Sequence, residues 1–252
     1  MKNSHEVLVE SQFGDQAQAY LDSTVHAQGA DLQRLVQWLS DDAQATLLDI
    51  GCGAGHASFA AASRVAQVTA YDLSEKMLKV VSEAAAERGL HNLATAHGPA
   101  EALPFAAASF DIVISRYSAH HWHDVGMALR EVKRVLKPDG KFILMDIASP
   151  GLPILDVWLQ TVEMLRDPSH VRDYSQGEWL SMVNESGMAV NRLAVDRLDL
   201  EFSSWIERMQ TPDELTQAIR LLQAKASDSV KHHYAIQPDG SFSTDTIMFQ
   251  AG

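Results

Sequence analysis

Residues 46–56 read TLLDIGCGAGH, an apolar run that leads directly into three glycines spaced two residues apart. A short apolar run that ends at glycines is typical of a buried strand followed by a turn, and residues 55–66 then predict a helix. Glycine allows the close approach of the backbone to a ligand that such a turn requires. The stretch therefore predicts the first strand, the ligand-binding loop and the first helix of an α/β unit.

The alternation of strand and helix continues on the C-terminal side of this loop. Strands are predicted at 46–50, 67–72, 93–97, 110–115 and 141–147, and the next helices at 75–88 and 124–136. Gly89 is predicted to cap a helix, and residues 138–140 to form a turn before the fifth strand. Repeated strand–helix units predict an α/β fold of the Rossmann-like, doubly wound type, with a mostly parallel sheet.

The flanking segments are predicted to be largely helical. Upstream helices are expected at 16–20 and 31–39, where they would form a helical cap over the edge of the sheet that binds ligands. Downstream, helices are expected at 150–166, 178–186 and 212–232, and a strand at 191–202. Residues 234–237 and 241–249 flank Pro238-Asp239-Gly240 and predict a C-terminal antiparallel hairpin.

Composition limits the classes of partner. The chain of 252 residues has a formal net charge of −13, which disfavours nucleic acid and anionic membrane surfaces as partners. No apolar stretch has the roughly 20 residues of a membrane span, and the first residues lack the apolar core of a secretory signal. We therefore expect a cytoplasmic protein, and the acidity points to solubility and to a neutral or cationic substrate. The single cysteine, Cys52, cannot form an internal disulfide.

Two acids, Asp49 and Asp72, indicate a nucleoside site. Asp72 ends the second predicted strand, 23 residues after Asp49, at the same edge of the sheet. A carboxylate there accepts hydrogen bonds from both ribose hydroxyls, although Asp72 or Ser74 also suits the start of the next helix. A dinucleotide fingerprint would have its third glycine at position 56, which is His56, so an oxidoreductase is disfavoured.

The compact glycine loop resembles motif I of the class I S-adenosylmethionine-dependent methyltransferases. Residues 98–113, GPAEALPFAAASFDIV, resemble the family's segment before the fourth strand, and residues 131–140, EVKRVLKPDG, resemble its helix and turn before the fifth. The resemblance spans about 46–147 and is closest to the small-molecule branch with the ubiquinone/menaquinone-biosynthesis-type methyltransferases. It implies methyl transfer from S-adenosylmethionine to an unidentified small molecule, with S-adenosylhomocysteine as product.

The resemblance also implies the residues that bind the cofactor. They are Asp49, Gly51, Cys52, Gly53, Gly55, His56, Asp72, Leu73, Met77, Ala100, Glu101 and Arg116. One departure is Pro99, which stands where the family has an acid that accepts from the adenine amino group, so Ala100 backbone groups or Glu101 would replace it. This departure leaves open a noncatalytic S-adenosylmethionine-binding or sensor protein.

Acceptor chemistry is expected in the loop after the fourth strand, residues 115–124, SRYSAHHWHD. Histidine titrates near neutrality, so His120 and then His121 are the candidate general bases. Tyr20, His120 and Asp146 are candidate substrate-binding residues. Arg116 either binds the cofactor or forms an ion pair on the surface. No metal is expected, because the histidines lack partners at metal-ligand spacing.

One methyltransferase domain is expected over residues 1–252. Residues 1–45 would form the N-terminal helical cap, residues 46–148 the cofactor-binding core, and residues 149–252 the substrate-side helices and closing strands. The sequence leaves the acceptor atom and the oligomeric state open.

Overall fold

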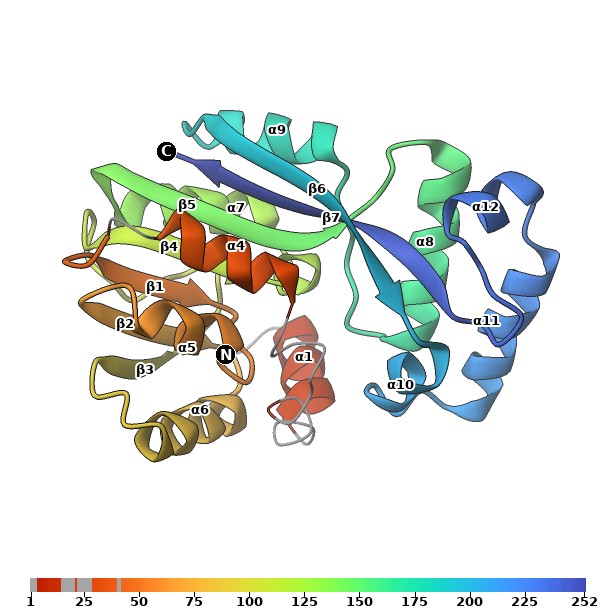
Figure 1. Cartoon of the computed structure of the whole chain (residues 1–252), viewed down its shortest axis with the longest axis horizontal. Coiled ribbons are helices and arrows are strands. Elements are labelled where there is room, and N and C mark those ends of the chain that lie inside the picture. Colours follow the sequence, from red (N-terminus) through yellow and green to blue (C-terminus); the bar gives the residue numbers. More distant parts are fainter. Residues whose placement is uncertain (1–3, 15–20, 22–28, 40–41) are drawn as a thin grey trace.

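A twisted sheet forms the centre of the computed structural model, which describes residues 4–14, 21, 29–39 and 42–252 (Figure 1). Within these residues, seven strands form one sheet in the order β3-β2-β1-β4-β5-β7-β6. They are β1 (Thr46–Ile50), β2 (Gln67–Asp72), β3 (Leu93–His97), β4 (Phe110–Arg116), β5 (Leu136–Ala148), β6 (Val190–Leu200) and β7 (Phe242–Ala251). The strands β1 to β5 are parallel, and β7 runs antiparallel to both β5 and β6. The expected Rossmann-like fold is confirmed.

Helices cover both faces of the sheet because its strands bury alternate residues on opposite sides. In β4, Ile112 and Ile114 join a core formed with α4 (Ala30–Trp38) and α5 (His56–Ala62). Val113, between them, joins the opposite core formed with α7 (Val125–Val135) and α9 (Gln176–Glu185). The helix α6 (Glu75–Glu87) packs against β2 and β3.

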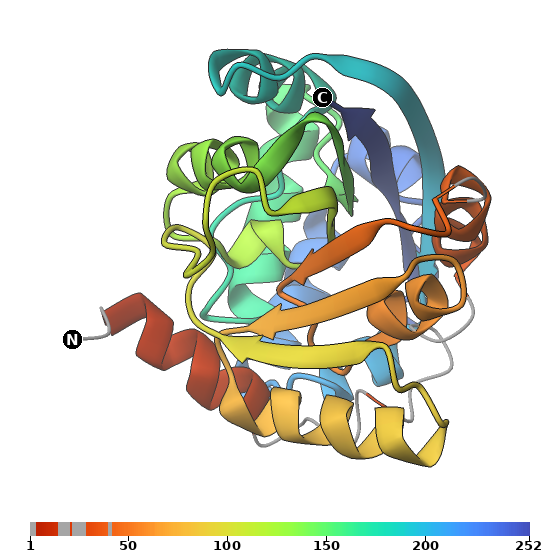
Figure 2. The same ribbon diagram turned by 90° about the vertical axis from the view of Figure 1, so that its left-hand side faces the viewer.

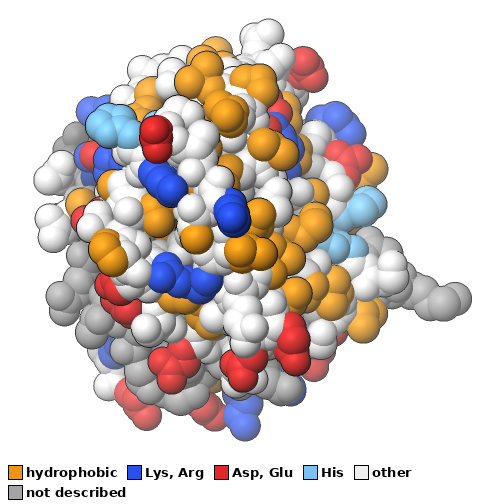
Figure 3. All heavy atoms as spheres, turned by 90° about the vertical axis from the view of Figure 1, so that its right-hand side faces the viewer, with side chains coloured by type: hydrophobic (Ala, Val, Ile, Leu, Met, Phe, Trp, Pro, Cys, Tyr) orange, Lys and Arg blue, Asp and Glu red, His pale blue; other side chains and the backbone are white. Residues whose placement is uncertain are grey.

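The remaining C-terminal helices gather beyond one end of β6 and β7 (Figure 1). They are α8 (Pro153–Arg166), α10 (Phe202–Glu207), α11 (Asp213–Lys225) and α12 (Asp228–His233). Their core contains Trp158 and Tyr234, whose rings are 4.4 Å apart, and Trp205. The face of the molecule on this side carries hydrophobic, acidic and basic side chains together (Figure 3). Among the described residues, no helix is long and apolar enough to cross a bilayer.

Several predicted elements differ in the structure. The predicted helix 212–232 is two helices, because the chain is extended at Ala226 and the Ser227 hydroxyl accepts from Val230 N to begin α12. Residues 234–237 form no strand, so the partner of β7 at the end of the chain is β6. The predicted turn at 138–140 is instead an irregularity within β5, where the register with β4 shifts. The predicted helix at 16–20 lies outside the described residues.

The order of the strands places a crevice beside β1 and β4. These two strands are neighbours, and the chain continues from β1 to β2 on one side and from β4 to β5 on the other. The carboxyl ends of parallel strands at such a point are where α/β sheets bind ligands. The helix α1 (Ser4–Gly14) lies beside α6 near this edge (Figure 2), within the segment expected to form a helical cap but before the first helix range predicted there.

Candidate active site

The loop after β1 has a backbone that only glycine adopts readily. Gly51, Gly53 and Gly55 have φ angles of 66°, 51° and 87°. The amides of Gly51 and Cys52 both donate to the carbonyl oxygen of Tyr71 in β2, at 2.8 and 3.1 Å. Since other residues pay roughly 1–2 kcal/mol for a positive φ, the three glycines explain how the chain turns from β1 into α5.

Asp49 is a buried acid beneath this loop. Its Oδ2 accepts from the Ser58 hydroxyl at 2.6 Å, whereas its Oδ1 is buried without a hydrogen-bond partner among the described residues. Burial raises the pKa of Asp49 to about 7, with the Ser58 hydrogen bond opposing this rise and the charge of Asp72 adding to it. A buried oxygen without a partner is costly, and it indicates a place for a hydrogen-bonding or cationic ligand.

Asp72 links the glycine loop to the next helix. Its Oδ2 accepts from Gly53 N and its Oδ1 from Ser74 N, both at 2.8 Å. Burial raises the pKa of Asp72. Ser74, rather than Asp72, caps α6, because its hydroxyl accepts from Met77 N at 3.3 Å. Each carboxylate oxygen can accept a further hydrogen bond, so Asp72 can still bind a diol.

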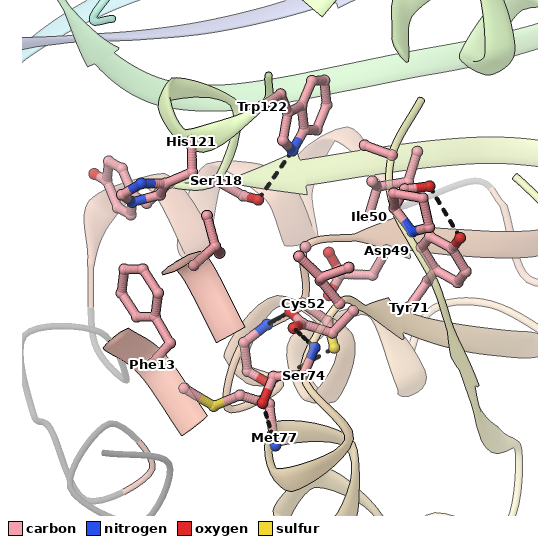
Figure 4. Close-up of a pocket in the computed structure, with 18 of the residues that line it drawn as sticks. Phe13, Asp49, Ile50, Cys52, Tyr71, Ser74, Met77, Ser118, His121 and Trp122 are labelled. Carbon is pink, nitrogen blue, oxygen red and sulfur yellow. Dashed lines mark hydrogen bonds between the residues drawn. The ribbon is translucent and has the colours of Figure 1, made fainter. Parts of the chain in front are cut away.

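A cavity of about 1150 Å³ opens between these residues and the loop after β4 (Figure 4). It brings together all of the predicted cofactor residues except Gly55: Asp49, Gly51, Cys52, Gly53, His56, Asp72, Leu73, Met77, Ala100, Glu101 and Arg116. Its mixture of apolar walls with a few polar groups is typical of a ligand site.

Two of these predicted residues have protein partners that the sequence did not reveal. Glu101 accepts from Asp124 N at 3.1 Å, near the start of α7. The Arg116 guanidinium forms a two-point ion pair with Asp31 of α4. The ion pair that was the alternative for Arg116 is therefore present, although it lies at the cavity and not on the open surface.

The helix α1, which belongs to the segment 1–45 expected to form a helical cap, supplies a wall of the cavity. His5, Val9 and Phe13 line the cavity from positions four residues apart, which lie on one face of a helix. The His5 ring donates to the carbonyl oxygen of His121 at 2.8 Å, and the rings of Phe13 and His121 meet edge to face at 4.9 Å. This four-residue spacing is the sequence signal that could have placed a helix at residues 4–14.

A second cavity, of about 1010 Å³, adjoins the first. Both cavities are lined by Phe13, Arg116, Tyr117 and His121, which form the wall between them. The second cavity extends under the C-terminal helices and is also lined by Ile147, Asp173, Leu198, Leu200, Trp205 and Met209.

The candidate catalytic residues have unequal surroundings. His120 lines the second cavity, and its Nδ1 lies 2.6 Å from Oδ1 of the buried Asp146. His121 lies in the shared wall, where burial and then the charge of His120 lower its pKa to about 3. Asp146, predicted to contact the substrate, lines neither cavity and contacts His120 instead. Tyr20 lies outside the described residues. Among the described residues, no group of histidine, cysteine and acidic side chains could hold a metal ion.

Comparison with known proteins identifies the family. Residues 48–144 match the family described as a methyltransferase domain. YafE of Escherichia coli K12 is 57% identical over 80% of this chain and 97% of its own. The methyltransferase YcgJ of Bacillus subtilis 168 is 39% identical over 90% of each chain, and its crystal structure matches 87% of this chain and 96% of its own with a TM-score of 0.84. A demethylmenaquinone methyltransferase of Listeria welshimeri is 32% identical over 62% of this chain and 70% of its own.

The family of these relatives is the one that the glycine loop and the crevice between β1 and β4 indicate. This chain belongs to the class I S-adenosylmethionine-dependent methyltransferases, and it transfers the methyl group of S-adenosylmethionine to an acceptor and releases S-adenosylhomocysteine.

Proposed function

We propose that the first cavity binds S-adenosylmethionine and that the second binds a small-molecule acceptor. The observation that carries this proposal is the wall shared by the two cavities at the carboxyl ends of β1 and β4. In this arrangement residues 46–148 bind the donor, residues 149–252 enclose the acceptor, and residues of the segment 1–45 cover the boundary. Methyl transfer is an in-line displacement, so the protein contributes chiefly by aligning the two ligands and excluding water.

The residues of the first cavity fit the cofactor. S-adenosylmethionine supplies a methyl group on a positively charged sulfonium, and it carries an α-ammonium and a ribose diol. The unpartnered Asp49 Oδ1 suits the ammonium, and Asp72 suits the diol. The glycine backbone allows close approach of the ligand's amino-acid end.

The part of the first cavity proposed to bind adenine has apolar side chains and backbone polar groups. Leu73, the buried Met77 and Ala100 line the cavity. Glu101 already accepts from Asp124 N, and the carbonyl oxygen of Pro99 accepts from the Tyr71 hydroxyl at 3.0 Å. We propose that backbone groups near Ala100 replace the acid that Pro99 displaces.

His120 is the proposed catalytic residue, and Asp146 is its positioning residue. A protein that only sensed the cofactor would have no use for a histidine–carboxylate pair at a second cavity. This pair supports the enzyme over the noncatalytic alternative. We propose that His121 shapes the wall between the two ligands, because its low pKa makes it a poor base.

Calorimetric titration of the purified protein tests the donor site. We expect both S-adenosylmethionine and S-adenosylhomocysteine to bind with micromolar or tighter affinity once any copurified ligand has been removed. Folded protein that binds neither compound would overturn the proposed donor site.

The affinity for S-adenosylhomocysteine should rise with pH. Only ionised Asp49 pairs with the ligand's ammonium, and with a pKa of about 7 its ionised fraction rises from roughly a tenth near pH 6 to nine tenths near pH 8. We expect up to about tenfold tighter binding across this window. Asp49→Asn should bind more weakly and lose this part of the pH dependence, because the ligand's own titration is common to both proteins. The same slope in both proteins would contradict the assignment.

A further inference from the structure

The strand β6 lies at one edge of the sheet (Figure 1). It pairs with β7 on one side, and among the described residues no strand pairs with its other side. Alternate backbone amides and carbonyl groups of an edge strand point to that side, where they can bind another strand. Two apolar side chains of β6, Leu193 and Val195, are 36% and 51% exposed. A long edge strand with exposed apolar side chains favours pairing with a further strand.

The side chains of β6 alternate between the two faces of the sheet. The exposed Arg192 and Asp196 share the face that α4 covers. The Arg192 guanidinium lies 4.8 Å from the centre of the Trp38 ring, and Asp196 pairs with Arg34. The Asp196 side chain nevertheless stays 45% exposed, so α4 orients it without enclosing it. One face of the strand thus carries an exposed base and an exposed acid, and the other face carries the two exposed apolar side chains.

A second copy of β6 can pair with the first in a register that matches both faces. When a twofold axis relates two identical antiparallel strands, one residue lies opposite itself, because hydrogen-bonded and non-hydrogen-bonded pairs alternate. With Ala194 on the axis, Arg192 of each copy lies opposite Asp196 of the other, and Leu193 of each copy lies opposite Val195 of the other. Each pairing occurs twice, and cross-strand pairs of opposite charge or of two apolar side chains stabilise a sheet.

The neighbouring registers lack this match. An axis at Asp196 would place that acid opposite itself, and an axis at Leu193 or Val195 would place both charged side chains opposite aliphatic ones. Like charges opposite each other destabilise a sheet, and a charge opposite an aliphatic side chain gains nothing. The irregularity in the pairing of β6 with β7 lies before Arg192, so the segment 192–196 is regular. The charge pattern therefore selects the register with Ala194 on the axis.

We propose that the protein forms a twofold dimer in which two β6 strands pair antiparallel about Ala194. The two seven-stranded sheets then join into one continuous sheet. A twofold contact of this kind closes on itself, whereas pairing of β6 with β3, at the other edge of the sheet, would leave free edges and continue into a filament. Asp196, Arg197, Leu198 and Leu200 of β6 also line the second cavity, so the dimer supports one wall of that cavity.

The net charge of −13 on each copy opposes association. Near physiological ionic strength, screening limits this repulsion to about 8 Å. Side chains that lie opposite each other on neighbouring strands are closer, with Cβ atoms roughly 5 Å apart, so their attraction is screened less than the repulsion between whole molecules. An edge contact is small for a dimer interface, and we therefore expect a dissociation constant in the micromolar range.

Sedimentation velocity across the micromolar range tests the dimer. We expect a species with twice the 27.7 kDa mass of one chain to accumulate as the concentration rises. Arg192→Asp and Asp196→Arg each place like charges opposite each other twice, so each should weaken the dimer at least about tenfold. Asp199→Arg is the matched control, because it makes the same change of charge at an exposed position of β6 beyond the paired residues 190–198. It should leave the dissociation constant within about twofold.

An equimolar mixture of Arg192→Asp and Asp196→Arg separates a lost register from a lost fold. In a mixed dimer one chain has acids at positions 192 and 196 and the other has bases at both, so every opposite pair again has opposite charges. We expect the mixture to regain the dimer that each variant alone loses, and thermal unfolding to show both variants folded. A wild-type chain that stays at 27.7 kDa, a dimer that Asp196→Arg weakens no more than Asp199→Arg does, or a mixture of folded variants that stays monomeric would overturn the inference.

Discussion

We expect Asp72→Ala to weaken the binding of S-adenosylhomocysteine roughly 30- to 1,000-fold. The substitution removes a carboxylate proposed to accept from both ribose hydroxyls, and two charge-assisted hydrogen bonds are together worth about 2–4 kcal/mol. It also removes the acceptor for Gly53 N and Ser74 N, so the glycine loop loses its connection to α6. Calorimetric titration measures the affinity, and thermal unfolding shows whether the variant is folded.

Glu75→Ala is the matched control for Asp72→Ala. Glu75 is an exposed acid in the first turn of α6, three residues from Asp72, and it lies outside the first cavity. Its removal changes the net charge by the same amount and should leave the affinity within about twofold, since exposed charges contribute little. Equal affinities of wild type and Asp72→Ala would place the ribose elsewhere.

The donor side of the fold could be predicted from sequence because its signals are local. The strands from 46–50 through 110–115 end within about a residue of their predicted positions, since each is a short apolar run next to glycine or acid. The loop between β1 and α5 has three glycines within five positions, and each adopts a positive φ. A site formed by residues that are close together in the sequence, such as this loop, can be predicted from the sequence.

The acceptor side could not be predicted in the same way, because its contacts join distant segments. His120 meets Asp146 across 26 residues, and His121 meets His5 across 116. Nothing in residues 167–173 marks Asp173 as a buried acid at a cavity. The predicted hairpin at 234–249 was wrong for a related reason: residues 234–237 form no strand, and β7 pairs instead with β5 and β6, which are distant in sequence.

The shared wall explains how one fold can separate donor chemistry from acceptor choice. Most of the proposed donor contacts come from the loops after β1 and β2, whereas α8, β6 and the segment around α10 contribute to the second cavity, which is proposed for the acceptor. The Gln12 side chain of α1 also donates to Met209, at 3.1 Å, so α1 touches both sides. On the proposed assignment of the two cavities, we expect substitutions under the C-terminal helices to change the acceptor without disturbing the glycine loop.

Gly51→Ala should destabilise the protein and disrupt the contact between the loops after β1 and β4. A Cβ at position 51 would lie 1.8 Å from Ser118 Oγ and 2.5 Å from Ser118 Cβ, so the loops after β1 and β4 would have to separate. The positive φ of 66° adds roughly 1–2 kcal/mol of strain to an overpacking cost of about 1–3 kcal/mol. For a chain of this length we expect the midpoint of thermal unfolding to fall by roughly 5 to 20 °C, with a parallel loss of cofactor affinity.

Two variants separate the collision from the backbone strain. Gly53→Ala has a similar φ, 51°, but its Cβ would meet no atom within 4 Å, so it should cost the strain alone, about 1–2 kcal/mol. Ser118→Gly removes both atoms that a Cβ at position 51 would strike, so the double variant Gly51→Ala/Ser118→Gly should regain the overpacking part relative to Ser118→Gly alone. If Gly51→Ala and Gly53→Ala lowered the midpoint equally, the close packing of Gly51 against Ser118 would have no role in holding the two loops together.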